Sequence, residues 1–469
     1  MTILQSPLPK ADALQAIRQR CGAAALVAPA DAAGRRISPG GDLLAAVPLL
    51  RPAGTDEVAF MVRQVQAAGG ALVPLGGASG LAGGLKPVTG QEWYLSLERM
   101  RAIEEIDPVS RIVVVQAGVV LQTLQDAVAE QGLLFAVDLG ARGSATVGGL
   151  VATNAGGERV LRFGMMREQV LGLEVVLADG TVLDLMDRVL KNNAGFDLKQ
   201  LFIGSEGTLG IVTRAVLRLR PAFAGHDAAF LSLRSLADLP RLLTRLEAGL
   251  GGTLSAFELM WPEFLQTMTE GAGAQHRMPL GPGAAGYLLV EAEGGDQETD
   301  QKRFMAVLEQ LLEDGVIADA AVAQSEAERK GFWALRNDIA RLILTWSPLV
   351  AFDVSVPIAQ MSSYVDDTRA ALCLRWPQAR LLVFGHVADN NLHLVVTLGA
   401  ETAAQSAAVG DVVYAGVRAR RGSISAEHGI GLDKRDALAK SRPPEVMALM
   451  RQMKRWLDPH ALLNPGKVI

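Results

Sequence analysis

Two histidines on either side of a short polar segment could share one metal ion. Asp389, Asn390 and Asn391 separate two apolar runs and are residue types that tolerate tight turns. If Asp389 and Asn390 form a two-residue hairpin turn, His386 directly opposes His393. Cross-strand partners have Cβ atoms roughly 5 Å apart, close enough for two imidazoles to bind one ion. The alternative is a structural pair, because histidine is often a satisfied, partly buried polar group.

A carboxylate and a third histidine are neighbours in the stretch Ser423–Gly431. Adjacent side chains point in different directions, so we expect Glu427 and His428 to have different tasks. Two histidines and one carboxylate form a ligand set that leaves coordination positions open for a substrate. The alternative is a helix-capping pair on a solvated loop. We expect surface or packing positions for the remaining histidines, which are His226, His276 and His460.

Two glycine-rich loops lie upstream and predict a bound cofactor. The stretch Asp138–Gly157 contains six glycines and four alanines, and Pro74–Gly84 follows the apolar run Ala71–Val73. Backbone N–H groups in such loops form concave anion sites that suit a diphosphate. We therefore expect an extended nucleotide cofactor rather than merely flexible loops. A Rossmann unit is disfavoured, because neither loop shows the strand–GxGxxG–helix pattern.

Five further motifs follow the loops in order: Lys191–Lys199, Gly204–Ile211, Gly385–His393, Ser425–Gly431 and Asn464–Lys467. Together with the loops they resemble the vanillyl-alcohol-oxidase type of FAD-binding flavoproteins. Within this type, the chain is most similar to the D-2-hydroxyacid dehydrogenases that act on D-2-hydroxyglutarate or D-lactate. The resemblance runs from about Leu43 to the C-terminus. It implies an α+β fold, with a two-subdomain FAD-binding part and an α/β cap domain that contains an antiparallel sheet.

Three segments follow from this resemblance and from composition. We expect an FAD-binding domain at 1–221, a substrate or cap domain at 222–420, and a C-terminal segment at 421–469 that returns to the FAD domain. The first boundary is placed at Pro221, where the glycine-rich character fades. In the cap domain, strands and helices alternate as in an antiparallel sheet covered by helices. The pattern there includes one long helix from Glu326 to Thr345.

The resemblance also assigns roles at the site. It implies that His386, His393 and Glu427 bind a divalent metal, and an N₂O ligand set suits Zn²⁺ best. It makes His428 the general base and Arg336 a ligand of the substrate carboxylate. From the residues alone, Arg336 is equally well a surface cation on an amphipathic helix.

FAD contacts are implied for the glycine loops, the Gly204–Ile211 motif and the tail. No histidine or cysteine stands in the first loop, so we expect FAD to be bound without a covalent link there. The implied contacts are Pro74, Gly76, Gly77, Ala78, Ser79, Gly80, Leu81, Asp138, Gly140, Ser144, Thr146, Gly148, Gly149, Thr153, Asn154, Gly156, Gly157, Glu206, Gly210, Ile211 and Asn464.

The chain departs from the dicarboxylate-binding members of the family at three positions near the site. A hydroxyl residue one turn after the arginine is here Ala340, a lysine is here Ala351, and an asparagine is here Val395. Glycines of the histidine hairpin are replaced by Ala388 and Asn390. We therefore expect a broad substrate preference, with D-lactate, D-malate and D-2-hydroxyglutarate all as candidates.

The expected activity is an FAD-dependent D-2-hydroxyacid dehydrogenase that passes the C2 hydride to flavin and yields a 2-oxo acid. Alternatives are a flavoprotein oxidase, a flavin-binding electron-relay subunit of a larger complex, and a non-redox flavoprotein of the alkyl-ether-lipid synthase type. The electron acceptor is expected to be an electron-transfer flavoprotein, a quinone or a cytochrome. A homodimer is a further expectation.

Bulk composition excludes several other classes. The chain of 469 residues has a net charge of −5, and its 45 basic and 50 acidic residues are interspersed, which argues against nucleic-acid binding. No apolar run is long enough to span a bilayer. Met1–Pro7 lacks a signal-peptide pattern. Cys21 and Cys373 are the only cysteines, so a disulfide framework is not expected and a cytoplasmic location is predicted.

Overall fold

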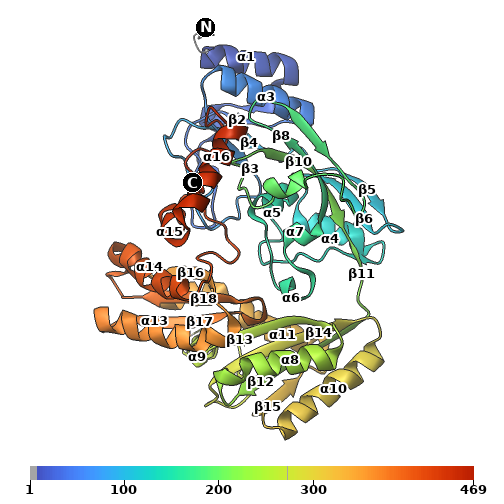
Figure 1. Cartoon of the computed structure of the whole chain (residues 1–469), viewed down its shortest axis with the longest axis vertical. Helices are drawn as coiled ribbons and strands as arrows, with labels where there is room; N and C mark the ends of the chain where they lie inside the picture. Colours follow the sequence, from blue (N-terminus) through green and yellow to red (C-terminus); the bar gives the residue numbers. More distant parts are fainter. Residues whose placement is uncertain (1–7, 272) are drawn as a thin grey trace. The chain divides into compact units, whose positions relative to one another are not determined.

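A computed structural model describes residues 8–271 and 273–469 (Figure 1). Residues 1–7, for which the sequence predicts no signal peptide, lie outside the described part. Among the residues described, no helix is both long enough and hydrophobic enough to cross a membrane. Cys21 and Cys373 are unpaired, and Cys373 is exposed.

The chain forms two compact units. The second contains Glu158–Arg162 and Ala222–Ala426, and the first contains the other described residues. The segment 421–426, which the sequence groups with the C-terminal return, therefore lies in the second unit. Residues 427–469 lie in the first.

The first unit begins with a small sheet in the strand order β1–β2–β4–β3, in which β2 and β3 run parallel to β4. Helix α3 connects β2 to β3, and its buried residues Val58, Met61, Val62 and Val65 recur at helical spacing. The elements are α1 (Lys10–Cys21), β1 (Leu26–Val27), α2 (Pro29–Ala32), β2 (Leu49–Leu50), α3 (Thr55–Ala67), β3 (Leu72–Leu75) and β4 (Trp93–Ser96). The first glycine loop starts where β3 ends.

The second sheet of this unit is antiparallel, in the order β5–β6–β10–β8–β9. Val147 and Val151 of α5 pack into the core that this sheet forms, which fixes the helix that contains part of the second glycine loop. The elements are β5 (Ile103–Asp107), β6 (Ile112–Gln116), α4 (Leu121–Ala129), β7 (Leu133–Leu134), α5 (Val147–Thr153), α6 (Val160–Phe163), α7 (Met166–Gln169), β8 (Val170–Val176), β9 (Val182–Leu185), β10 (Ile211–Arg218) and β11 (Arg220–Pro221).

The C-terminal segment completes the first unit. After α15 (Arg435–Ser441) and α16 (Pro444–Leu457), the chain runs beside β3. There Leu72 N donates to Leu462 O, and Asn464 N donates to Leu72 O, both at 2.7 Å. Lys454 Nζ donates to the carbonyls of Thr208 and Leu463, both at 2.7 Å. The tail thus joins β3 to the Gly204–Ile211 motif.

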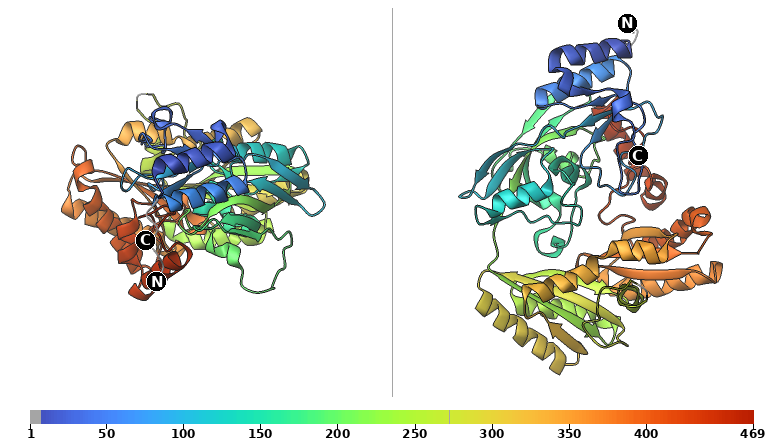
Figure 2. Two further views of the ribbon diagram at one scale, coloured as in Figure 1. Left: turned by 90° about the horizontal axis from the view of Figure 1, so that it is seen from above. Right: turned by 180° about the vertical axis from the view of Figure 1, so that it is seen from behind.

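The second unit is built on one antiparallel sheet, as predicted, whose strands are drawn in green to orange in Figure 2. The strand order is β15–β12–β14–β13–β17–β18–β16. Its strands are β12 (Gly225–Leu233), β13 (Leu254–Met260), β14 (Gly286–Gly294), β15 (Asp319–Val322), β16 (Val350–Ser355), β17 (Arg380–His386) and β18 (Asn391–Thr397). Its helices are α8 (Leu239–Leu250), α9 (Pro262–Thr269), α10 (Gln297–Glu313), α11 (Glu326–Asn337), α12 (Ile339–Trp346), α13 (Met361–Arg375) and α14 (Thr402–Ala419).

The single helix predicted at Glu326–Thr345 is wrong, because the chain breaks it at Asp338. The side chain of Asp338 accepts a hydrogen bond from Arg341 N at 3.1 Å and so caps a new helix, α12. α11 ends one residue earlier, and Arg336 lies in its last turn.

Candidate active site

The histidine hairpin has a wider turn than predicted. Val387–Asp389 form a short 3₁₀ turn and Asn390 follows with φ +74°, so Phe384 rather than His386 opposes His393. The prediction that the two histidines directly oppose each other is therefore wrong. His386 lies two residues beyond Phe384 and shares its face of the sheet. The two imidazoles still meet diagonally, with ring centroids 5.4 Å apart and planes at 82°.

The structure brings the three predicted metal ligands together. One ligand atom each from His386, His393 and Glu427 lie within 4.8 Å of one another. The histidines come from β17 and β18. Glu427 follows Ala426, whose N–H donates to Asp353 O at 3.3 Å. This hydrogen bond to β16 therefore fixes the position of the backbone that leads into Glu427.

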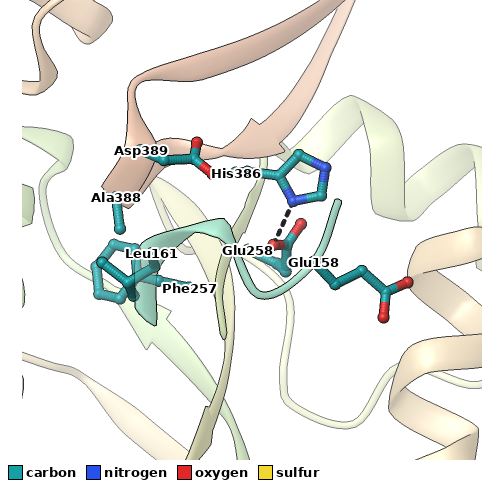
Figure 3. Close-up of a pocket in the computed structure, with 7 residues that line it drawn as sticks. All are labelled: Glu158, Leu161, Phe257, Glu258, His386, Ala388 and Asp389. Atoms are coloured by element: carbon teal, nitrogen blue, oxygen red, sulfur yellow. Dashed lines mark hydrogen bonds and ion pairs between the residues drawn. The ribbon is translucent and has the colours of Figure 1, made fainter. Parts of the chain in front are cut away.

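Each of these histidines has a carboxylate on its Nδ1 side. His386 Nδ1 lies 2.6 Å from Glu258 Oε1, and the two residues are register partners on β13 and β17 (Figure 3). His393 Nδ1 lies 4.0 Å from Oδ1 of Asp353, its register partner on β16. Because a carboxylate only accepts, Nδ1 of His386 is the donor in this contact. Metal-binding histidines commonly have such a partner, so this donor set fits a divalent metal.

Glu258 is the functional residue that the sequence analysis missed. It is 1 % exposed. Arg336 Nε donates to its Oε2 at 3.0 Å, and Arg336 Nη2 lies 2.9 Å from the same oxygen. Burial alone would raise the pKa of Glu258, but the charges and hydrogen bonds of His386 and Arg336 lower it to about 2. Its signal in the sequence is a lone carboxylate inside the apolar strand Leu254–Met260, because a buried charge requires partners.

Arg336 lies on the same face as the histidines. It is 4 % exposed, and its guanidinium carbon is 4.7 Å from the centre of the Phe384 ring. That ring is 4.9 Å from the ring of His393. The alternative interpretation of Arg336 as a surface cation is therefore wrong. Its predicted role as a ligand of the substrate carboxylate stays a prediction.

Two of the three positions that lack polar anchors lie on the sheet beside this site, and the third, Ala340, lies in α12. Ala351 and Val395 are direct register partners on β16 and β18, two pairs along from Asp353 and His393. Val395 packs in the apolar cluster that contains Phe384, whereas Ala351 and Ala340 are exposed. None of the three side chains offers a hydrogen bond.

A small hollow lies beside His386 and Glu258 (Figure 3). Two further carboxylates line it, from Glu158 and Asp389. Glu158 accepts a hydrogen bond from Asn337 Nδ2 at 3.0 Å, next to Arg336 in α11. The remaining lining residues are Leu161, Phe257 and Ala388.

His428 lies in a loop that Glu206 holds. Ile430 N and Gly431 N donate to the two carboxylate oxygens of Glu206 at 2.7 and 2.8 Å, while burial raises the pKa of this glutamate. A Cβ on Gly431 would lie 1.9 Å from Ala82 O. The glycine is therefore needed for close approach to the first glycine loop. His428 itself is half-buried.

The two glycine loops touch each other in the first unit. A Cβ on Gly77 would lie 1.8 Å from Ser144 O, so only glycine permits this approach. Two buried polar atoms here, Thr146 Oγ1 and Asn464 Oδ1, have no hydrogen-bond partner among the described residues. Orphaned acceptors and donors beside closely packed backbone fit a polar ligand such as FAD.

The other predicted FAD contacts occupy several elements. Gly148, Gly149 and Thr153 lie in α5, and Asn154 ends that helix with φ +49°. Gly210 is surrounded by side chains: a Cβ there would lie 2.6 Å from Val175 and 3.0 Å from Phe202. Ile211 is 1 % exposed and belongs to the same core. Core packing thus already explains Gly210 and Ile211, and their FAD contact stays a prediction.

Two family models match the chain. The model "FAD binding domain" matches residues 48–186, which include both glycine loops. The model "FAD linked oxidases, C-terminal domain" matches residues 226–468, which include Glu258, Arg336 and the three predicted metal ligands.

Several named proteins are similar in sequence. Mitochondrial D-2-hydroxyglutarate dehydrogenase of Bos taurus is 41 % identical over 422 residues, which cover 90 % of this chain and 76 % of that protein. D-2-hydroxyglutarate dehydrogenase of Xanthomonas citri pv. viticola is 40 % identical over 423 residues, covering 89 % and 88 %. A mitochondrial protein of Schizosaccharomyces pombe named for D-lactate dehydrogenase is 35 % identical, covering 90 % and 81 %.

Solved structures share the fold at lower identity. Alkyldihydroxyacetonephosphate synthase superposes with a TM-score of 0.74 at 16 % identity and covers 98 % of this chain and 87 % of that one. p-Cresol methylhydroxylase gives 0.74 at 17 % identity, covering 99 % and 98 %. These similarities establish the FAD-binding fold that the sequence predicts.

Proposed function

Because the chain belongs to the family of FAD-linked oxidoreductases that includes the D-2-hydroxyglutarate dehydrogenases, we propose that it oxidises D-2-hydroxy acids to 2-oxo acids with the help of a divalent metal. The observation that supports the metal is the meeting of His386, His393 and Glu427 within 4.8 Å. Carboxylates behind both histidines add to this support. Zn²⁺ suits the N₂O donor set best.

Each residue then has a distinct task. When bound, FAD supplies the hydride acceptor and the metal supplies Lewis acidity toward the C2 hydroxyl. Arg336 binds and orients a substrate carboxylate, for which the Nη1 atom is available because Nε and Nη2 contact Glu258. His428 accepts the hydroxyl proton. His386, His393 and Glu427 would hold the metal.

A substrate panel tests the activity. D- and L-2-hydroxy acids are supplied with an artificial dye, with and without chelator. Dye reduction with D isomers that chelator abolishes supports the proposal, and no reduction with any acid refutes it. Oxygen consumption in the same assay distinguishes the oxidase from the dehydrogenase. Cytoplasmic location, a homodimer and the three acceptor classes stay predictions, and the Bos taurus relative is named mitochondrial.

FAD should be bound without a covalent link, through Gly76–Leu81 and Ser144–Asn154. Acid denaturation of the purified yellow protein should release the chromophore into the supernatant, because the first loop offers no histidine or cysteine for attachment. Absorbance of the supernatant and of the pellet measures this. Colour that stays with the precipitate, or a colourless protein that FAD does not reconstitute, contradicts the prediction.

Restoring one missing anchor should shift substrate preference. The wild type should accept D-lactate, D-malate and D-2-hydroxyglutarate broadly, because Ala351 and Val395 offer no partner to a second carboxylate. Ala351→Lys should raise the ratio of kcat/KM for D-2-hydroxyglutarate to that for D-lactate by about 10-fold, since a charge-assisted hydrogen bond contributes about 1.5 kcal/mol or more.

The matched control is Leu374→Lys, which adds the same charge at a side chain that is 89 % exposed in α13. It should leave the ratio unchanged. A wild type that is strict for one dicarboxylate would mean that other residues, such as those around the hollow, anchor it.

A further inference from the structure

We propose that Glu258 is a positioning residue that holds His386 and Arg336 in one fixed arrangement, so that the metal-binding nitrogen and the carboxylate-binding guanidinium face a substrate together. This inference rests on the proposed function. It adds a residue to which neither the motifs nor the substrate contacts point.

Both oxygens of Glu258 are used, one for each partner. Oε1 lies 2.6 Å from His386 Nδ1, and Oε2 accepts a hydrogen bond from Arg336 Nε at 3.0 Å and lies 2.9 Å from Arg336 Nη2. With the side chain 1 % exposed, water does not compete for these bonds. Neither partner can rotate without breaking a buried hydrogen bond.

The two contacts fix orientation as well as position. Donation from Nδ1 to Glu258 leaves Nε2 of His386 as the nitrogen for the metal. Contact through Nε and Nη2, with the guanidinium stacked 4.7 Å over Phe384, fixes the plane of Arg336. A glutamine at this position has one acceptor and one donor end, so it could satisfy His386 or Arg336 but not both.

A second arginine–glutamate pair between α11 and a neighbouring strand of the same sheet provides a matched control. Arg329 of α11 donates to Glu291 Oε1 of β14 at 2.8 Å, and the Glu291 side chain is 6 % exposed. This pair also joins the sheet to α11 but includes no histidine. Glu291→Gln therefore measures the effect of losing a buried carboxylate–arginine pair without any change at the site.

The experiment compares Glu258→Gln and Glu291→Gln in the full-length flavoprotein. Zn²⁺ affinity is measured by chelator competition, and kcat and KM for D-lactate are measured at saturating Zn²⁺. Glu258→Gln should weaken Zn²⁺ binding by about 10–100-fold or raise KM by at least about 10-fold, depending on which contact the glutamine keeps. Glu291→Gln should change either value less than about threefold. Wild-type values in a folded Glu258→Gln variant would overturn the inference.

A measurement on the unmodified, metal-free protein does not depend on that variant's folding. The chain has 6 histidines, so ¹⁵N spectra of labelled histidine, with His386→Asn for assignment, can identify the tautomer of His386. The Nδ1–H form supports the inference, and the Nε2–H form overturns it. If instead the wild type neither binds Zn²⁺ nor oxidises any D-2-hydroxy acid, the proposed function fails, while the tautomer still reports on the contact with Glu258.

Discussion

Replacing His386 and His393 together with alanine should abolish stoichiometric metal binding and lower kcat/KM for D-2-hydroxy acids by about 10³-fold. Lewis-acid stabilisation of developing charge contributes several kcal/mol to a transition state, and each 1.36 kcal/mol changes the rate tenfold. Metal analysis after gel filtration and dye-reduction kinetics measure the two effects. Flavin content should not change, because both histidines lie in the hairpin of the second unit and the predicted flavin contacts lie in the first.

His460→Ala is the control for loss of a histidine, because His460 is exposed and outside the cluster. It should keep its metal and its activity. Exhaustive chelation of the wild type should reproduce the double variant, and added Zn²⁺ should reverse the chelation but not the mutations. Full activity in the double variant, or after chelation, would exclude a metal from the reaction.

Replacing His428 with asparagine should lower kcat by roughly 10²–10⁴-fold, the usual contribution of general-base catalysis. A neutral imidazole has a nitrogen lone pair that can accept the proton of an acidified hydroxyl. Metal and flavin content should stay at wild-type levels, because Glu206 holds this loop through Ile430 N and Gly431 N.

The comparison variant is Glu427→Gln, one residue earlier in the chain. It should lose metal occupancy and regain part of its activity at high Zn²⁺, whereas His428→Asn should not respond to Zn²⁺. A His428 variant that loses metal and recovers when metal is added would make His428 a ligand, and the base would then have to be another residue.

The sequence predicted elements and motifs more accurately than it predicted contacts. The antiparallel sheet of the second unit follows from strand patterns, and the FAD-binding fold follows from the family resemblance that the motifs carry. The hairpin was also predicted, but its register was not. Asn390 takes the left-handed conformation one residue after a 3₁₀ turn, and the choice between this turn and a two-residue turn is not determined by the residue types Asp and Asn alone.

Contacts between distant residues were the least predictable part. Glu258 lies 128 residues before His386, and no local pattern connects a glutamate in one strand with a histidine so far along the chain. The break at Asp338 was missed for a different reason. The apolar spacing continues across it, while the capping aspartate that starts α12 is a weaker signal than the periodicity. The meeting of His386 and His393 was predicted because a hairpin makes it local.

The return of the C-terminus to β3 has a consequence for how the protein is made. A ribosome completes the second unit once Ala426 has been added, but the first unit still lacks the segment that bonds to Leu72 and to Glu206. At 5–20 residues per second, synthesis of Ala222–Ala426 takes on the order of 10–40 s. The nascent flavin-binding part waits through this time with an unpaired strand edge. Chains that terminate early keep that edge permanently, which makes them substrates for chaperones and proteases.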